Sequence, residues 1–379
     1  MSHMSVTSQV TMPSGESVPA GGSAPSGMLA CVVHGAHDLR VDTLPAPEPG
    51  PGLVAIDVAY GGVCGSDLHY VAHGGIGDFP LREPMVLGHE VSGTVAALGE
   101  GRTAGVGEGG VPAVGAAVTV YPASPCGRCP ECRDGRANVC RDTRYLGSSM
   151  RYPHTQGGFA QRIVVRPDQV VALPAGVDLR RGALAEPLSV ALHAVRRAGD
   201  VRGKRVLVTG AGPIGALVVA VLRHEGAAQI VVSDLLDGAL AISRAVGATA
   251  TVRADDPDDP HWPDEVDIAI DASGSPHGVA AGAARLVRGG RLVLLGILPP
   301  GQTPFPGNLV VTRELEVVGA FRFHHEIHDA VRLLAGGLDV DAVITGVVPL
   351  TQAGRAFEMA TDRTTSSKVL LDLRPEASS

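Results

Sequence analysis

Four of the six cysteines in this chain stand close together, at Cys126, Cys129, Cys132 and Cys140. Their spacing, C-x2-C-x2-C-x7-C, lets three thiolates at three-residue intervals and one from a returning loop surround a tetrahedral ion. A redox CxxC pair is the alternative, but it needs two cysteines at a helix start, and this segment is rich in Pro and Gly. We therefore predict a structural zinc lobe at 126–140. A closed four-ligand site leaves no position for a substrate, so we expect the chemistry elsewhere.

A glycine-rich turn offers the second kind of chemistry. An apolar run at 206–209 leads into Gly210, Gly212 and Gly215, and an acid, Asp234, follows the next apolar run. In a strand–turn–helix context these glycines let a backbone approach a pyrophosphate, which then lies at a helix N-terminus. An acid at this distance accepts hydrogen bonds from the adenosine ribose and repels a 2′-phosphate. We therefore predict NAD, in preference to NADP.

Two further stretches carry zinc-compatible groups. "GGVCGSDLHY" supplies Cys64, Asp67 and His69, and "LGHEVSG" supplies His89 and Glu90. Thiolate, imidazole and carboxylate are the ligands of catalytic zinc sites. Each stretch alone is also compatible with polar residues at a strand end. A third acid, at position 186 in "LAEPLS", opens the run that leads into the glycine-rich turn.

The elements around these groups predict an α/β protein. Short strand-like runs broken by Gly and Pro occupy about 28–174 and predict a β-rich region. A helical pattern covers 180–199, and strands and helices then alternate to about 319, which predicts a doubly wound parallel sheet. Beyond that point we expect a helix at 325–337 and a strand at 367–373.

Composition limits the classes of function. The 379-residue chain has a net charge of −8, no Lys/Arg-rich run and no apolar run that approaches the length of a membrane helix, which argues against nucleic-acid and membrane partners. Residues 1–27 are rich in Ser, Gly and Pro, and we expect a disordered tail that begins with an expression-vector remnant, "MSHM". The sequence shows no secretory signal pattern, so we expect a cytoplasmic protein.

Taken together, the motifs resemble the zinc-dependent medium-chain alcohol and polyol dehydrogenases over about residues 28–373. The resemblance rests on "CGSDLHY", "PMVLGHEVSGTV", the cysteine lobe, "EPLSVALHA" and "GAGPIG". Residues 144–161 and 319–331 resemble the sorbitol and L-idonate dehydrogenase branch, and L-idonate 5-dehydrogenases most. The resemblance to this family implies a GroES-like catalytic domain from 28–180 and 319–379 and a Rossmann domain at 181–318. It also implies a homo-oligomer, with a tetramer favoured over a dimer.

The resemblance also implies roles for individual residues. It implies that Cys64, His89, Glu90 and Glu186 bind the catalytic zinc, and that Asp67 orients His89. Ser66 and His69 match a proton relay to solvent, and Tyr70, Glu186 and Arg322 match sugar contacts. The positions that match NAD contacts are Gly210, Gly212, Pro213, Ile214, Gly215, Asp234, Ser273, Gly274, Gly296, Ile297, Ala320 and Phe321.

The substrate prediction goes further than the resemblance. Arg151 and His154 follow the cysteine lobe, and with Arg322 they would supply three potential cations near a zinc site. A carboxylate-bearing sugar needs such cations, and a neutral polyol does not. We therefore expect an L-idonate-like sugar acid. The alternatives are a sorbitol or xylitol dehydrogenase, another secondary-alcohol dehydrogenase, and a non-catalytic nucleotide-binding relative.

Overall fold

The computed structural model describes residues 27–102, 105 and 110–375. The predicted tail lies outside this range except for Gly27, which begins the first strand. Among the described residues, no helix combines the length and the apolar character needed to cross a membrane.

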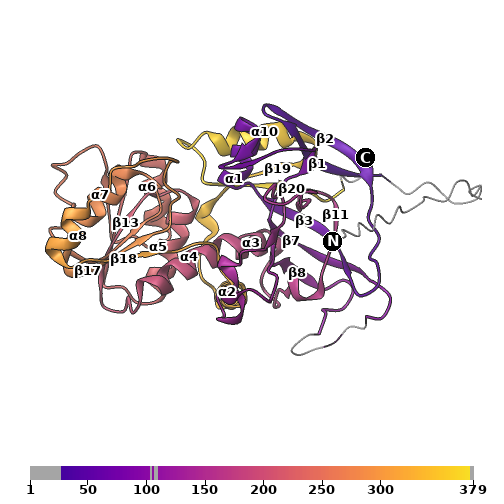
Figure 1. Ribbon diagram of the computed structural model, residues 1–379, viewed down its shortest axis with the longest axis horizontal. Helices are drawn as coiled ribbons and strands as arrows, with labels where there is room; N and C mark the ends of the chain where they lie inside the picture. The colour runs from indigo at the N-terminus through magenta and orange to yellow at the C-terminus, as the bar shows by residue number, and fades with distance from the viewer. Residues whose placement is uncertain (1–26, 103–104, 106–109, 376–379) are drawn as a thin grey trace, which may run out of the picture.

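A β-rich unit is built from both ends of the chain (Figure 1). Its main sheet has the order β12-β8-β7-β3-β20-β19, with β11 also paired to β3. The strands of this sheet are β3 (Val54–Gly62), β7 (Glu90–Leu98), β8 (Ala117–Val120), β11 (Arg162–Val165), β12 (Val170–Ala172), β19 (Ile344–Pro349) and β20 (Lys368–Asp372). The smaller strands are β1 (Gly27–Gly35), β2 (Asp38–Pro45), β4 (Gly75–Ile76), β5 (Phe79–Pro80), β6 (Met85–Val86), β9 (Ala123–Ser124) and β10 (Arg144–Tyr145). Helices α1 (Gly65–His73), α2 (Pro130–Arg133) and α10 (Ala353–Thr361) complete the unit.

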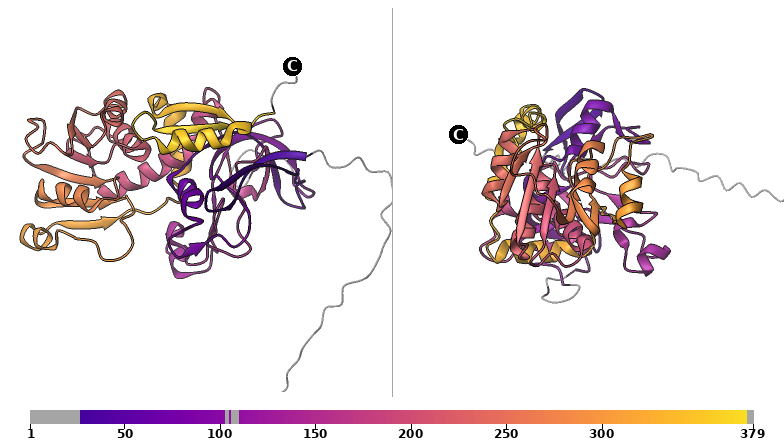
Figure 2. Two further views of the ribbon diagram at one scale, coloured as in Figure 1. Left: turned by 90° about the horizontal axis from the view of Figure 1, so that it is seen from above. Right: turned by 90° about the vertical axis from the view of Figure 1, so that its left-hand side faces the viewer.

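A six-stranded parallel sheet forms the other unit, with the order β15-β14-β13-β16-β17-β18. Its strands are β13 (Arg205–Thr209), β14 (Gln229–Asp234), β15 (Ala250–Arg253), β16 (Val266–Asp271), β17 (Leu286–Leu294) and β18 (Glu316–Gly319). The accompanying helices are α3 (Leu179–Ala183), α4 (Ala185–Ala198), α5 (Pro213–His224), α6 (Asp237–Ala245), α7 (Pro276–Ala284), α8 (Gly307–Arg313) and α9 (Glu326–Ala335). Figure 2 shows the helices on both faces of this sheet. The α/β class and the doubly wound sheet are confirmed.

The structure differs from the sequence prediction in three places. The helix expected over 180–199 is two helices, because Pro187 lacks an N–H and its ring would clash with the carbonyl of Ala183. Helix α7 ends at Ala284 rather than near Gly289, because the chain enters β17 at Leu286. Strand β19 and helix α10 were not predicted from the sequence.

We propose the domain division 28–180 with 319–379, and 181–318, with one refinement. The apolar face of α9 (Ile327, Leu334) shares a core with α4 and α5, whereas β19 and β20 join the β-rich sheet. Helix α9 therefore packs with the parallel-sheet unit, and the chain returns to the β-rich unit only after it.

Candidate active site

The four clustered cysteines lie together in a short lobe around α2. Their four Sγ atoms all lie within 4.8 Å of one another. The backbone N–H groups of Cys126 and Asp142 donate to Sγ of Cys140, each at 3.3 Å, which suits a thiolate rather than a disulfide sulfur. The donor set and the backbone donors fit a closed structural zinc site.

A second group of metal-compatible atoms comes from two separate segments. Cys64 caps the start of α1, and His89 and Glu90 stand at the beginning of β7. One ligand atom from each lies within 4.8 Å of the other two. Thiolate, imidazole and carboxylate at this spacing fit a catalytic zinc, which would act as a Lewis acid toward a hydroxyl oxygen when bound.

Asp67 contacts the segments that carry this group. Its carboxylate is fully buried and accepts hydrogen bonds from N–H of Cys64 at 2.9 Å and of Gly88 at 3.2 Å. Oδ1 also lies 4.0 Å from Nδ1 of His89. Burial raises the pKa of Asp67, and His89 opposes that rise. The carboxylate thus fixes the two segments that carry the three ligands and also faces the imidazole of His89, as expected for a residue that orients His89.

The local charge favours a cation. Burial alone would lower the pKa of His89, but the hydrogen bond and charge of Cys64, with Asp67 and Glu186, raise that pKa well above its usual value. Surroundings that stabilise a proton here would also stabilise a metal ion.

Glu90 forms an ion pair with Lys368, a residue that the sequence motifs do not indicate. Nζ of Lys368 donates to Oε1 of Glu90 at 2.7 Å and to the carbonyl of Val63 at 3.0 Å, and both side chains are buried. Glu90 and Cys64 raise the pKa of Lys368 against the effect of burial. The other oxygen of Glu90, Oε2, is buried and has no hydrogen-bond partner. A buried carboxylate oxygen without a partner fits a metal ligand.

Glu186 is close but lies outside the compact three-residue group. It stands in the first turn of α4, and its Oε1 accepts a 2.7 Å hydrogen bond from the hydroxyl of Tyr145. Burial raises the pKa of Glu186 to about 7, and the nearby His89 opposes that rise. Tyr145, also missed by the sequence analysis, places its ring edge against His89, with centroids 5.6 Å apart.

Helix α1 presents the proposed relay residues. Ser66 is partly exposed and His69 is exposed, so His69 can exchange protons with water. Tyr70 is buried, and its hydroxyl accepts hydrogen bonds from N–H and Oγ of Ser149, at 2.9 and 3.1 Å.

The three potential cations have different surroundings. The guanidinium of Arg322 stacks on the ring of Tyr145, 4.4 Å from its centroid, and donates to Sδ of Met150. Among the described residues it has no acidic partner within ion-pair distance. Its backbone φ of 53° is the left-handed conformation, which is costly for a non-glycine residue and is found at functional sites.

Arg151 and His154 are engaged with the protein itself. Arg151 donates to the carbonyl of Arg141 and forms an ion pair with Asp142 at 3.1 Å. His154 is buried, its Nε2 accepts from N–H of Arg82, and its Nδ1 lies 2.9 Å from the carbonyl of Arg151. Both ring nitrogens are therefore occupied, and neither is free for a substrate.

The glycine-rich turn has the geometry of a nucleotide site. Gly210 has φ 95°, and a Cβ there would lie 2.6 Å from the backbone nitrogen of Ser273. Gly212 precedes α5 and has open space around it. Asp234 ends β14, and its carboxylate accepts from N–H of Ala211 at 2.7 Å and of Leu236 at 3.0 Å. The acid is thereby fixed beside the turn that would hold the pyrophosphate.

The loops after β16, β17 and β18 carry further predicted nucleotide contacts. Buried Asp271, a residue missed from sequence, accepts hydrogen bonds from the backbone N–H groups of Ser273 and Gly274 and from Oγ of Ser273. Gly274 packs directly on Ile297, whose side chain is 80% exposed although it is apolar. The remaining predicted contacts lie at the start of α5 (Pro213, Ile214, Gly215), after β17 (Gly296) and after β18 (Ala320, Phe321). Exposed Ile297 and Phe321 suit contact with a flat cofactor ring.

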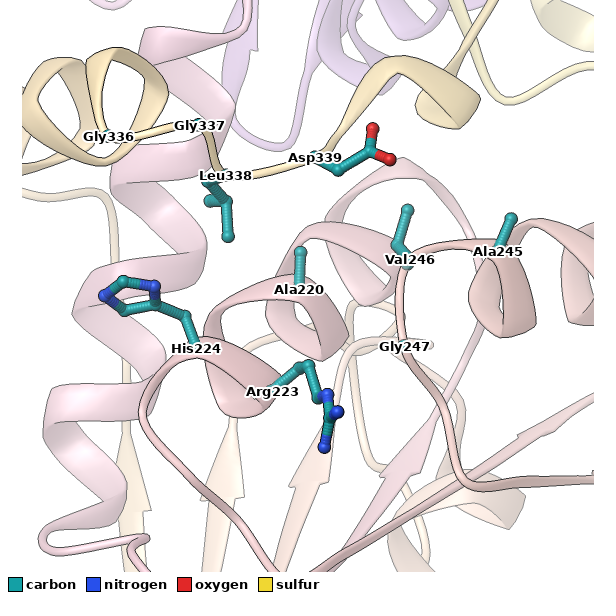
Figure 3. A pocket seen from close by; sticks show the side chains of 10 residues that line it. All are labelled: Ala220, Arg223, His224, Ala245, Val246, Gly247, Gly336, Gly337, Leu338 and Asp339. Carbon is teal, nitrogen blue, oxygen red and sulfur yellow. The ribbon is translucent and has the colours of Figure 1, made fainter.

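One pocket has no part in this site. It has a volume of about 320 Å³ and lies between the ends of α5 and α6 and the turn after α9 (Figure 3). Its polar lining comes from Arg223, His224 and Asp339, and it contains none of the residues described above.

The comparisons with known proteins agree with this geometry. The "Alcohol dehydrogenase GroES-like domain" family matches residues 50–175, and the "Zinc-binding dehydrogenase" family matches residues 213–336. The L-idonate 5-dehydrogenase (NAD(P)(+)) of Escherichia coli is 35% identical over 90% of this chain and 98% of its own length. The sorbitol dehydrogenase of Bacillus subtilis is 32% identical over 88% of this chain and 93% of its own.

Solved structures show the same relationship. The crystal structure of L-idonate 5-dehydrogenase from E. coli has a TM-score of 0.83 and 34% identity, and covers 91% of this chain and 98% of its own. The chain therefore belongs to the zinc-dependent medium-chain alcohol and polyol dehydrogenases, and it is an oxidoreductase that acts on CH–OH groups with zinc and a nicotinamide dinucleotide.

Proposed function

We propose that this enzyme oxidises a secondary hydroxyl of a sugar acid, with NAD as the hydride acceptor and an L-idonate-like aldonate as the preferred substrate. The observation that carries the proposal is Arg322: a guanidinium stacked on Tyr145, which itself binds Glu186, with no acidic partner among the described residues. A planar guanidinium in this state matches a carboxylate well. The similarity to an L-idonate 5-dehydrogenase supports the same substrate class.

The residues divide the work as follows. Cys64, His89 and Glu90 would hold the catalytic zinc, with Glu186 beside them, and the metal would supply Lewis acidity toward the substrate hydroxyl. Ser66 and exposed His69 pass the hydroxyl proton to water. Gly212 and Asp234 would hold and orient NAD, which would supply the hydride acceptor when bound.

The second candidate is a sorbitol or xylitol dehydrogenase. Two of the three cations expected around a sugar acid, Arg151 and His154, are occupied by protein groups, which reduces the demand for a charged substrate. The relatives similar to this chain include sorbitol dehydrogenases. Of the three predicted substrate cations, Arg322 is the one whose substitution distinguishes the two candidates.

The test is a steady-state comparison of L-idonate, D-gluconate, sorbitol and xylitol. Arg322→Met should lower kcat/KM for the aldonates by about ten- to a hundred-fold, since a charge-assisted hydrogen bond contributes about 1.5–3 kcal/mol, and should lower it much less for the polyols. Arg151→Met is the matched control, because its guanidinium already pairs with Asp142, and it should discriminate as the parent does. A parent enzyme that prefers sorbitol, or an Arg322→Met variant with unchanged discrimination, would contradict the proposal.

We also propose a cytoplasmic homo-oligomer. The edge strand β18 pairs only with β17 among the described strands, and two exposed apolar residues, Phe305 and Val311, precede it in the sequence. An unpaired edge with apolar neighbours favours association with a second copy. Sedimentation of the purified protein tests the oligomeric state, and a monomer would contradict it.

A further inference from the structure

A buried ammonium group stands beside the proposed zinc ligands. Lys368 is 2% exposed and Glu90 is 1% exposed, and their charged groups lie 2.7 Å apart. In the part of the chain that the structure describes, Lys368 is the only Lys or Arg that forms an ion pair with a proposed ligand. Burying a lysine is costly unless it is paired and hydrogen-bonded, and this one meets both conditions through Glu90 and the carbonyl of Val63.

The sheet order brings this lysine to the site from the far end of the sequence. Strand β20 pairs with β3, and β3 pairs with β7, so the first residue of β20 reaches past the end of β3 to the first residue of β7. Gly62, the last residue of β3, leaves the space that the Glu90 carboxylate occupies, because a Cβ there would collide with that carboxylate. The contact is therefore fixed by the backbone of three strands.

The pair leaves the two oxygens of Glu90 in different states. Oε1 accepts from the ammonium group, whereas Oε2 is buried without a partner. A carboxylate with one oxygen bound to an ammonium group is a weaker donor to a metal ion than a free carboxylate, because the positive charge opposes the second cation. The ammonium also restricts the carboxylate to binding through its other oxygen.

We propose that Lys368 is a positioning residue that limits how strongly Glu90 holds the catalytic zinc. The inference rests on the proposed zinc site at Cys64, His89 and Glu90. Lys368 thus keeps Glu90 a displaceable ligand, so that a substrate hydroxyl can take its place. Neutralising Lys368 makes the zinc harder to remove.

The experiment measures zinc release from the holoenzyme into a colorimetric chelator, with total zinc per chain determined beforehand. The parent should release its two zinc ions in two phases, one from each site. Lys368→Met should slow only the active-site phase, by about ten-fold, which corresponds to about 1.4 kcal/mol. Lys368→Gln, whose side chain can still donate to the carbonyl of Val63, should slow the active-site phase in the same way. Lys368→Arg keeps the positive charge and should release zinc at the parent's rate.

Two further variants separate this inference from the proposed function. Cys64→Ser should leave one zinc per chain, and it identifies the active-site phase. Glu90→Gln removes the charge on which Lys368 acts, so Lys368→Met should have no effect on release in that background. If Cys64→Ser retains two zinc ions, the zinc site and the inference both fail. If it loses one but soluble Lys368→Met and Lys368→Gln release zinc at the parent's rate or faster, only the inference fails.

Discussion

The Asp234 carboxylate faces the glycine-rich turn through a hydrogen bond from N–H of Ala211. At that position it would lie close to the 2′-phosphate of NADP and repel it. We therefore expect the parent to prefer NAD, and Asp234→Ala to narrow the preference by about ten- to a hundred-fold, the equivalent of about 1.5–3 kcal/mol. The measurement is kcat/KM with both cofactors. The control is Asp264→Ala, at an exposed acid just before β16, which should leave the cofactor preference unchanged. Equal kcat/KM values of the parent with NAD and NADP would contradict the role of Asp234.

The carboxylate of Glu326 makes the stability of the fold depend on pH in the acid range. Burial would raise the pKa of Glu326, but the side chain of His193 at 3.0 Å and the N–H of His324 at 2.8 Å lower it to about 2, from an ordinary value of 4.5. Because the folded pKa is below the unfolded one, this stabilisation is present above pH 4.5 and is lost as the pH falls toward 2.

Glu326→Gln should therefore reduce the free energy of unfolding at neutral pH by about 1–3 kcal/mol, and by progressively less as the pH falls below 4.5. Urea unfolding at a series of pH values measures this. Glu358→Gln, at an exposed acid on α10, is the matched control and should change little. Equal losses for Glu326→Gln at pH 7 and pH 3 would show that the carboxylate charge is not the cause.

At the residue scale, the sequence indicates which side chains can bind zinc better than it indicates which other side chains contact them. The types and spacing of Cys64, His89 and Glu90 indicate a zinc site, and the structure brings the three together. Lys368, in contrast, begins a strand in a sequence that gives no sign of a buried charge, and only the order of the strands places it beside Glu90. His154 was expected to be a substrate cation, but its contacts with Arg82 and Arg151 depend on loops whose packing no local pattern encodes.

At the scale of elements, the cysteine lobe also contacts the segment that follows β18. Nδ2 of Asn138, in the short helical turn Ala137–Val139, donates to the carbonyl of Phe321 at 3.0 Å. Phe321 directly precedes Arg322, the proposed carboxylate contact. The lobe therefore links the β-rich unit to the segment that carries this arginine.

Cys132→Ser should remove one zinc per chain and lower the melting temperature, because a site with three thiolates loses the closed tetrahedral geometry. We expect activity per folded molecule to survive, with a raised KM for aldonates if the lobe positions Arg322. Zinc content, melting and specific activity are measured on one preparation. Cys31→Ala, at a buried cysteine outside both clusters, should keep both zinc ions. A Cys132→Ser protein with full zinc and unchanged melting would exclude a structural site.

The elements themselves were largely predictable from local pattern. The alternation over 205–294 gave the strands and helices of the parallel sheet, because buried parallel strands are nearly continuous apolar runs. The break between α3 and α4 could have been read from Pro187. Strand β19 and helix α10 were missed because their amphipathic runs are short.

For the whole molecule, β20 is an internal strand of the β-rich sheet rather than an appendage. It lies between β3 and β19, and Leu370 is fully buried against Tyr60 and Ala183. Figure 1 shows this C-terminal strand among the N-terminal ones. The two ends of the chain therefore stabilise one another.

Leu370→Ala should lower the free energy of unfolding by about 2–5 kcal/mol, since the site is enclosed and cannot collapse freely. Val347→Ala, at a 41% exposed position on the neighbouring strand β19, should cost about 0.5 kcal/mol or less. Chemical denaturation of the zinc-loaded protein provides both values. Similar losses at the two positions would contradict an internal place for β20.

The position of β20 also sets an order of events during synthesis. Chains leave the ribosome from their N-terminus, so β3 and β7 emerge long before β20, the strand that pairs with the end of β3. The cysteine lobe and the parallel sheet, each formed from a continuous stretch, can close before translation ends. Glu90 gains its ammonium partner only when the last strand arrives. A growing chain can therefore load the lobe with zinc early, whereas the active site takes its final form, and its final hold on the metal, only after β20 has been synthesised.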